Sequence, residues 1–515
     1  MRTATLVSLA FGLIVSACGG DASIPSLGAA DKSAGAASTT SPTSPAAPGS
    51  PGSPANGPDP GAAGACGSCT SSAAAPQGVC PAAASGKTIV VAAAGGDVKT
   101  IQAGVSAAAP GDTVLVRAGT YSESVSFSKS GSASGGCITL KGEAGAILDA
   151  AGKGEVGIGI DDKSYIRVAG MTVRNVKGGG TPIGISVRGG ASFIELRGNL
   201  VHGVESSSNA HGIAFYGDSA TPMSNLLIDD NEIKNCKLGQ SESMVLNGNV
   251  TKFVVSRNRV HDNDNIGIDF IGFEGTGPAG SDQAREGVCV DNVVYNISSA
   301  SNATYGGERA ADGIYVDGGR DIVIERNRVD NSDIGIEIAS EHQSKVTSNI
   351  VVRNNFVSRS YQGNVMIGGY ASNKGKAQNI AVLNNTLYQG GDGEVVLQYN
   401  STAITIKNNV CVAKAGNEYL VSSGGNNTNV TAESNLFFGA STTSAGAFPD
   451  ARAKFGNPML VSPPTDLHLQ AGSPAIDAGI DLGNDSAGKP LCGALDVDGA
   501  ARVGGGRVDI GADER

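Results

Sequence analysis

The chain has no tryptophan, and aromatic residues make up only 4% of its 515 residues. Such a composition argues against a core built on aromatic side chains and against a sugar-binding surface of aromatic platforms. Long apolar runs are missing after residue 17, so no later segment has the length and apolarity to span a bilayer. Excess positive charge is missing too, since 37 Lys and Arg face 48 Asp and Glu for a net charge of −11. That balance argues against nucleic acid or anionic lipid as the main partner.

Glycine is the abundant residue, at 75 of 515 positions, and it shows no collagen-like period. Seven short segments instead follow one alternating template, in which apolar residues face one side and polar residues the other. These segments are His211–Gly217, Glu242–Gly248, Ile266–Gly272, Asp312–Gly318, Ile334–Ser340, Gly363–Gly369 and Gly393–Tyr399. Repeated strands of this kind, each followed by a second apolar run and a turn, predict a repeat protein.

An asparagine recurs after each of these strands, at spacings of 23 to 35 residues. An Asn at a fixed corner can hydrogen-bond the turn backbone, tolerate a left-handed conformation and bond to the Asn of the next coil. The predicted column is Asn199, Asn231, Asn258, Asn292, Asn327, Asn354, Asn385 and Asn408. The variable spacing indicates one coil of fixed size with loops of different length inserted at its corners.

These repeats resemble those of the pectin-lyase-like superfamily, and the segment from Lys99 to Tyr121 resembles the entry coil of its bacterial polysaccharide-lyase members. The resemblance covers roughly residues 88 to 460. It implies an all-β, right-handed parallel β-helix, and a short amphipathic helix over Val98–Ala109 is expected to cover its open end. The superfamily includes lyases, hydrolases, epimerases and phage adhesins, so the resemblance defines the fold more closely than the reaction.

The N-terminus reads as an export signal followed by a lipid attachment site. Arg2 and the apolar run after it form a signal peptide over residues 1–17, and Val15–Cys18 resembles a bacterial lipobox. Cys18 would then be acylated, which implies a lipoprotein of the outer membrane or cell surface that meets the membrane only through this lipid. Residues 18–86 are rich in Ala, Gly, Ser and Pro and are expected to form a disordered tether. For Cys66 and Cys69, an exported chain favours disulfides over a metal site, and the pairing stays open.

The β-helix is expected over residues 87–460, and the C-terminal segment 461–515 is expected to close its last coil. That segment resembles a C-terminal motif found on secreted β-helix proteins. The largest insertions are predicted at 274–287 and 298–311. Loops gathered around one face build a binding site there, and we expect the protein to act on a polysaccharide as a monomer.

Three carboxylates are predicted to point outward from three neighbouring strands. Asp269, Tyr315 and Glu337 share a column, and Asp317 lies one outward position further along the middle strand. Equivalent residues of successive coils stack ~4.8 Å apart, so about 9–10 Å separates the backbones of Asp269 and Glu337. Like charges this close are costly unless one is protonated or a cation is bound.

The candidate catalytic residues are therefore Asp269, Asp317, Glu337, Tyr315 and His342, the last of these as a base or proton shuttle. The candidate substrate-binding residues on the same face or its loops are Asn247, Glu274, Glu341, Glu394 and Gln398. His211 begins a strand and either borders the site or packs at a corner.

Two reactions suit this arrangement. The resemblance favours a lyase of a uronic-acid glycan, in which calcium held by Asp269, Asp317 and Glu337 neutralises the substrate carboxylate. The residue types favour an inverting glycoside hydrolase with paired carboxylates. A non-catalytic glycan-binding or adhesive surface protein is the third possibility. Similar lyases often place a Lys or Arg base on the strand face, whereas Arg285, Arg309, Arg320 and Lys345 lie in or beside loops here.

Replacing Cys18 by Ala is predicted to release the protein from the membrane fraction or to block its maturation, because no other segment would hold it there. Fractionation of cells that express the Cys18→Ala variant checks this. Membrane association equal to that of the wild type would contradict the lipoprotein interpretation.

Overall fold

The computed structural model describes residues 77–83, 85–440 and 443–515. The signal peptide, Cys18, most of the tether, Cys66 and Cys69 lie outside these ranges, so their predictions are not tested by the structure. Within the described ranges, no helix has the length and apolarity needed to cross a membrane.

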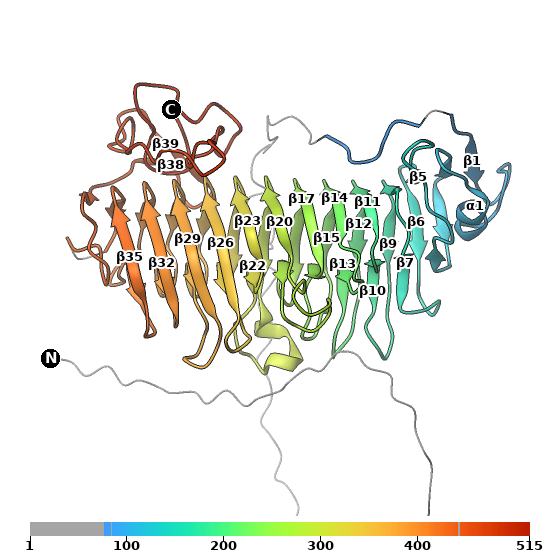
Figure 1. Cartoon of the computed structure of the whole chain (residues 1–515), viewed down its shortest axis with the longest axis horizontal. Helices are drawn as coiled ribbons and strands as arrows, with labels where there is room; N and C mark the ends of the chain where they lie inside the picture. The colour runs from blue at the N-terminus through green and yellow to red at the C-terminus, as the bar shows by residue number, and fades with distance from the viewer. Residues whose placement is uncertain (1–76, 84, 441–442) are drawn as a thin grey trace, which may run out of the picture. The chain divides into compact units, whose positions relative to one another are not determined.

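Three parallel sheets, which we name A, B and C, run along a solenoid of stacked coils (Figure 1). Sheet A contains β1 (Thr88–Val91), β2 (Thr113–Val116), β5 (Ile138–Gly142), β8 (Ile166–Ala169), β11 (Ser192–Arg197), β14 (Met223–Asp229), β17 (Val250–Ser256), β20 (Arg285–Val290), β23 (Arg320–Glu325), β26 (Val346–Arg353), β29 (Lys376–Leu383), β32 (Ser401–Lys407) and β35 (Thr428–Glu433). Sheet B contains β3 (Gly119–Tyr121), β6 (Ala146–Asp149), β9 (Thr172–Arg174), β12 (Leu200–His202), β15 (Glu232–Lys234), β18 (Arg259–Asn263), β21 (Val293–Ile297), β24 (Arg328–Ser332), β27 (Phe356–Ser358), β30 (Thr386–Tyr388), β33 (Val410–Val412), β36 (Leu436–Phe438) and β37 (Lys454–Phe455). Sheet C contains β4 (Val125–Ser126), β7 (Val156–Asp161), β10 (Ile183–Arg188), β13 (His211–Gly217), β16 (Met244–Gly248), β19 (Ile268–Ile271), β22 (Asp312–Asp317), β25 (Ile334–Ala339), β28 (Gly363–Ile367), β31 (Gly393–Leu397) and β34 (Leu420–Ser422).

The alternating template is explained by the interior of this solenoid. Ile268 pairs with Ile314, and Ile314 pairs with Ile336, so the apolar residues of successive coils stack on one another. All three are fully buried and belong to one continuous apolar core that runs the length of the coils. The right-handed parallel β-helix implied by the resemblance to the pectin-lyase-like superfamily is confirmed.

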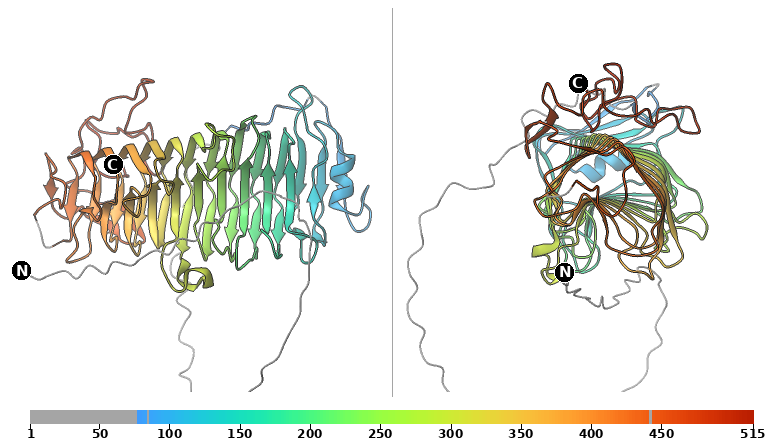
Figure 2. Two further views of the ribbon diagram at one scale, coloured as in Figure 1. Left: turned by 60° about the horizontal axis from the view of Figure 1, so that its bottom comes forward. Right: turned by 90° about the vertical axis from the view of Figure 1, so that its left-hand side faces the viewer.

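A short helix, α1 (Ile101–Ala107), lies at the N-terminal end of the solenoid (Figure 2). Thr100 caps it by accepting a hydrogen bond from the backbone N–H of Ala103. The Ile101 and Val105 side chains are buried in the same apolar core as the strands. The helix is shorter than the predicted 98–109 but buries the two residues that its amphipathic pattern singles out.

The asparagine ladder exists, but two of its predicted members are wrong by one residue. The amides of successive coils are linked by Nδ2–H···Oδ1 bonds of 2.9–3.0 Å along the series Asn199, Asn231, Asn258, Asn292, Asn327, Asn355, Asn385, Asn409 and Asn435. The predicted Asn354 and Asn408 are the first residues of Asn-Asn pairs and adopt left-handed φ values of 56° and 55°. Their amides point away from the ladder and donate to the C-terminal segment, at Cys492, Leu495 and Ile480.

The C-terminal segment packs on the side of the solenoid, whereas the sequence predicted that it closes the last coil (Figure 1). It contains the antiparallel pair β38 (Leu460–Ser462) and β39 (Asp466–Leu469). Leu467, Leu469 and Ile510 form a second apolar cluster with Phe356 and Val410 from the outer side of sheet B. The first-position asparagines hold this segment by the hydrogen bonds described above.

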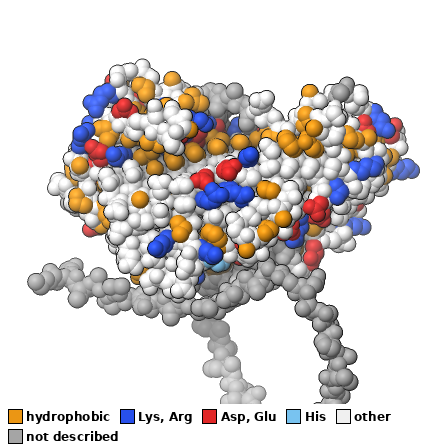
Figure 3. Space-filling model, in the orientation of Figure 1, with side chains coloured by type: hydrophobic (Ala, Val, Ile, Leu, Met, Phe, Trp, Pro, Cys, Tyr) orange, Lys and Arg blue, Asp and Glu red, His pale blue; other side chains and the backbone are white. Residues whose placement is uncertain are grey.

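Charged residues over sheet A lie in alternating pairs, and basic and acidic side chains stand side by side on this face (Figure 3). Arg326 Nε lies 2.9 Å from Asp291 Oδ1, and Arg353 Nε lies 2.7 Å from Glu325 Oε2 on neighbouring coils. A disulfide joins Cys80 to Cys137 and fastens the N-terminal segment to β5, while Cys236, Cys289 and Cys411 are buried thiols.

Replacing Asn327 by Ala is predicted to lower the free energy of unfolding by about 1–3 kcal/mol, because the buried amides of its neighbours lose an acceptor. Asn327 Oδ1 accepts from both the backbone N–H and the Nδ2 of Asn292. The control Asn373→Ala, at an exposed loop position, should change stability by less than about 0.5 kcal/mol. Chemical denaturation of both variants checks this, and equal stability losses would contradict a structural role for the ladder.

Candidate active site

The outward side of sheet C carries three parallel columns of side chains. In the middle column Asp269 lies opposite Tyr315, and Tyr315 lies opposite Glu337. Asp317 lies one outward position further along, opposite Ala339. A third column, which the sequence prediction did not include in the site, places Asp312 at the start of β22, opposite Ile334. The carboxyls of these residues are all at least nine-tenths buried, so this acidic face is packed and not merely solvated.

Asp312 and Glu337 form a hydrogen-bonded carboxyl pair. Burial raises the pKa of Glu337 to about 7, although the hydrogen bonds from Asp312 and Gln398 oppose the rise. Burial and the neighbouring Glu337 charge raise the pKa of Asp312 well above its ordinary value. Both carboxyls therefore hold a proton more tightly than an exposed acid does. Gln398 Nε2 donates to Glu337 Oε1 and also to the carbonyl of Gly368, 3.2 Å away, which fixes the pair from the far side.

Asp269 is a buried acid of the site with one carboxyl oxygen that has no protein partner. Burial raises its pKa well above the ordinary value, and the charge of Glu242 raises it further. Its Oδ1 is buried without a hydrogen-bond partner. An unpartnered buried carboxyl oxygen is unfavourable in a folded protein, so this atom is free to bond a ligand.

Asp317, Glu341 and Tyr315 form the side of the site next to the loops. The backbone N–H of Glu341 donates to Asp317 Oδ1 at 2.9 Å, and the Tyr315 hydroxyl donates to Glu341 Oε1 at 3.4 Å. Burial raises the pKa of Asp317 and of Glu341, and Lys374 opposes the rise at Glu341. Lys374 comes from the loop before β29, so the structure brings a cation to the site that the strand pattern does not show.

His342 lies at the rim, where its Nε2 is 3.0 Å from Glu274 Oε1, and this hydrogen bond raises the pKa of His342. Ligand atoms of Glu274, Asp317 and His342 lie within 4.8 Å of one another. The predicted calcium ligands Asp269, Asp317 and Glu337 do not form such a group among the described residues. Calcium requires 6–8 oxygen ligands, whereas the group that does converge includes an imidazole nitrogen. This group differs from the predicted calcium ligands, and calcium at Asp269, Asp317 and Glu337 stays a prediction.

Glu394 is a correction to the predicted substrate-binding set. Its carboxyl is fully buried inside the coil, where it accepts from Asn364 Nδ2 at 2.5 Å and from the Gly390 N–H at 3.1 Å. Burial raises its pKa to about 8. Asn247 does lie on the outward side of sheet C, opposite Ile271, and its Oδ1 is buried without a partner.

His211 borders the site through a chain of three side chains. Its Nε2 lies 2.7 Å from the Tyr216 hydroxyl, and its Nδ1 lies 3.3 Å from Glu242 Oε2. His211 is 3% exposed and Glu242 is 9% exposed, while Tyr216 reaches the surface. Because Glu242 also acts on Asp269, this chain connects electrostatically with the acidic face.

The fold and this face together define a right-handed parallel β-helix protein with buried acids on the outward side of one sheet. No family model matches the chain. It is 34% identical over 324 residues to the uncharacterized protein YwoF of Bacillus subtilis (strain 168), an alignment that covers 59% of this chain and 68% of the relative. The chain belongs to the same family as YwoF.

Several solved structures are similar at low sequence identity. Pectate lyase Pel9A is 15% identical with a TM-score of 0.48, covering 83% of this chain and 96% of that chain. The alginate lyase AlyGC is 13% identical with a TM-score of 0.48, covering 74% and 55%. PfbA, a surface adhesin of Streptococcus pneumoniae, is 14% identical with a TM-score of 0.47, covering 67% and 85%. Likeness at this level says nothing about the reaction of this chain.

The stability of the protein is predicted to fall as pH rises through the Glu337 titration. The folded pKa of about 7 lies above the ordinary Glu value, so the folded state binds the proton more tightly. The contribution of Glu337 to the free energy of unfolding is fully present below pH ~4.3 and is lost by about pH 7. This loss is on the order of 3 kcal/mol. Glu337→Gln should flatten this slope, and Glu418→Gln, at an exposed position, should not. Denaturation curves across this pH range check it, and parallel slopes in all three proteins would show that Glu337 is not protonated in the folded state.

Proposed function

We propose that the protein is a carbohydrate-active enzyme that cleaves a polysaccharide at the acidic face, as a lyase of a uronic-acid glycan. The observation that supports this best is the hydrogen-bonded carboxyl pair Asp312–Glu337, together with the cation Lys374 that acts on the nearby Glu341. Glu341 connects the two, because its charge acts on both members of the pair and is itself opposed by Lys374. A cell-surface lipoprotein anchored at Cys18 and active as a monomer belongs to the same proposal.

The residues divide the steps of a β-elimination among them. Lys374 pairs with the substrate carboxylate, and neutral carboxyls such as Asp269 and Asp317 donate hydrogen bonds to it. Glu341 removes the proton alpha to that carboxylate, since a carboxylate of raised pKa is a better base. The bond to the glycosidic oxygen breaks as the new carbon–carbon double bond forms, and the Asp312–Glu337 pair supplies the proton that the leaving oxygen takes up. No step of this scheme requires a metal ion.

Hydrolysis is the second candidate, and one observation favours it. Asp269 and Glu337 lie on strands two coils apart with Tyr315 between them, which separates their backbones by about 9–10 Å. Inverting glycosidases use carboxyls ~6.5–9.5 Å apart with a water between them. Glu337 would then be the acid and Asp269 the base that activates the water.

Cleavage is predicted to depend on Glu337 and Lys374. A panel of uronic and neutral polysaccharides is incubated with the protein, and unsaturated ends and reducing ends are both measured, with calcium and with chelator. Unsaturated ends identify a lyase, and reducing ends without unsaturation identify a hydrolase. Glu337→Gln should lower turnover by about 10²–10⁴-fold under either reaction, because both need its proton. Lys374→Met should lower turnover for the lyase only.

Glu418→Gln is the matched control and should keep wild-type turnover, since Glu418 is exposed and lies outside the acidic face. Wild-type turnover in Glu337→Gln would place the chemistry elsewhere. Binding of a polysaccharide without cleavage, in the wild type and all variants, would identify a non-catalytic glycan-binding protein.

A further inference from the structure

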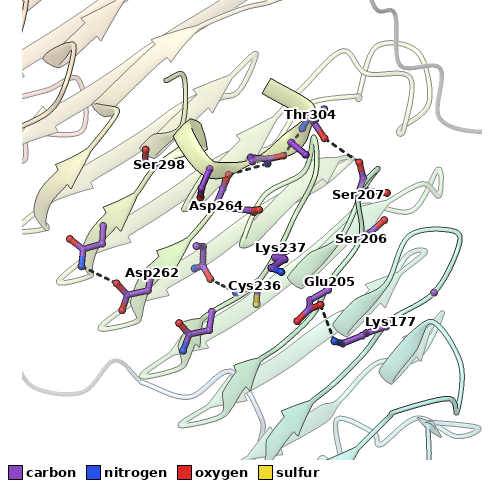
Figure 4. A pocket seen from close by; sticks show the side chains of 17 residues that line it. Lys177, Glu205, Ser206, Ser207, Cys236, Lys237, Asp262, Asp264, Ser298 and Thr304 are labelled. Carbon is purple, nitrogen blue, oxygen red and sulfur yellow. Dashed lines mark hydrogen bonds and ion pairs between the residues drawn. The ribbon is translucent and has the colours of Figure 1, made fainter. Parts of the chain in front are cut away.

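A groove of about 840 Å³ lies at the corner between sheets B and C, outside the acidic face of sheet C (Figure 4). Its walls come from the corresponding turns of successive coils. The lining residues are Lys177, Gly178, Glu205, Ser206, Ser207, Asn235, Cys236, Lys237, Asp262, Asn263, Asp264, Asn296, Ser298, Ser301, Asn302, Ala303 and Thr304. Volumes of ~300–1,000 Å³ are typical of ligand sites, so the groove is large enough for a small oligomer.

The loop after β21 forms one side of this groove and is held firmly. It contains the short 3₁₀ helices η2 (Ser299–Ser301) and η3 (Ala303–Tyr305), and Figure 4 shows it lying across the ends of the strands with Thr304 beside Ser207. Asn302 Nδ2 donates to the carbonyls of Gly239 and Asp264 at 2.7 and 3.0 Å. Thr304 Oγ1 donates to the Ser207 carbonyl at 3.1 Å. The groove is therefore preformed, which reduces the entropy lost when a ligand binds.

The same loop separates the groove from the acidic face. Tyr305, at the end of η3, accepts a hydrogen bond from Asn265 Nδ2 at 3.1 Å. Burial raises the pKa of Tyr305 to about 12, and the charges of Glu242, Glu341 and Asp312 add to the rise. The loop therefore borders the groove on one side, and its Tyr305 borders the acidic face on the other. A polymer bound in the groove lies next to the acidic face.

Most charged side chains of the groove have protein partners, whereas Lys237 is exposed and acts only through its charge on the carboxyl of Asp264. Lys177 Nζ lies 2.9 Å from Glu205 Oε2. The two carboxyl oxygens of Asp262 bind His261 Nδ1 at 2.6 Å and Asn296 Nδ2 at 2.9 Å, and Asp264 Oδ1 accepts from the Leu238 N–H at 2.7 Å. Three acids (Glu205, Asp262 and Asp264) outnumber the two lysines (Lys177 and Lys237) of the groove, so an anionic ligand would meet a net negative charge here. Burial raises the pKa of Cys236 to about 12, so its thiol is no nucleophile near neutral pH.

What remains available to a ligand is a set of serine hydroxyls, amide groups and backbone atoms. These both donate and accept, and the serines stand at two places along the solenoid axis, Ser206 and Ser207 after β12 and Ser298 and Ser301 three coils further along. A neutral, hydroxyl-rich chain that runs along the axis matches this pattern. We propose that the groove is a non-catalytic subsite for a neutral glycan segment. The proposal extends the proposed function, because the bound segment would hold its polymer beside the acidic face.

The test uses the full-length protein carrying Glu337→Gln, so that binding is measured without cleavage. Ser206→Trp fills the groove with a side chain at a partly exposed position, and Ser219→Trp is the matched control outside it. The probes are hexasaccharides of cellulose, mannan and dextran, with hexagalacturonate as the acidic probe, followed by calorimetry. At least one neutral hexasaccharide should bind, and Ser206→Trp should weaken it at least ~10-fold. Ser219→Trp should leave it unchanged, and hexagalacturonate binding should not respond to Ser206→Trp.

No binding of any neutral hexasaccharide, or binding that Ser206→Trp leaves intact, would overturn the subsite. Thermal unfolding of both Trp variants verifies that they fold. The two proposals fail separately. Loss of neutral binding in Ser206→Trp without polysaccharide cleavage by the wild type would keep the subsite and reject the enzyme. Cleavage that needs Glu337, without neutral binding, would keep the enzyme and reject the subsite.

Discussion

The asparagine ladder between sheets A and B is the interaction on which the rest of the structure depends. Each ladder amide donates to its neighbour and to a backbone carbonyl of a preceding coil, as Asn327 Nδ2 does to Asn355 and to the Cys289 carbonyl. This turn therefore has the same size in each coil from β11 to β36, and the strands on either side stay in register. A slip of one residue would exchange the two faces of a strand and turn the acids of sheet C inward. The position of the acidic face is a consequence of the ladder.

Most of the fold could be predicted because the coils repeat. Alternation in strands such as Ile334–Ala339 marks the buried side, and the recurring asparagine marks the corner. The errors occur where two residues of the same type compete for one position. In the pairs Asn354–Asn355 and Asn408–Asn409, composition does not show which amide joins the ladder. Geometry decides, because the first residue adopts the left-handed conformation and its side chain turns outward to the C-terminal segment.

The site was predicted less completely, and the reason is the bend at the start of the strands of sheet C. Gly313 and Gly335 lie in that bend, where a Cβ would meet the Cγ1 atoms of Val329 and Val357 at 2.5 and 2.6 Å. Glu394 is in the corresponding position of a later coil, so simple alternation placed it outside although it points inward. Asp312 comes one position before Gly313 and points outward. It therefore reaches the site, although the sequence pattern shows it only as the end of a strand. Lys374 was not predicted because it lies in a loop, where the alternating pattern of the strands does not apply.

Because the coils stack, equivalent residues of neighbouring coils lie close together. A column of acidic residues therefore has to be neutralised in some way. Over sheet A the means is an arginine on the next coil, as Arg257 Nη2 is 2.5 Å from Asp229 Oδ2. The outward columns from β16 to β28 have no Lys or Arg at all among their described positions. Burial instead raises the pKa of these acids, which costs stability as pH rises. The protein neutralises the acid columns over sheet A with arginine, but the outward columns of sheet C have no such partner. An unfavourable local arrangement of this kind is found at functional sites. In the proposed reaction these carboxyls would donate protons to the substrate, a role that neighbouring arginines would oppose by lowering the pKa of each acid.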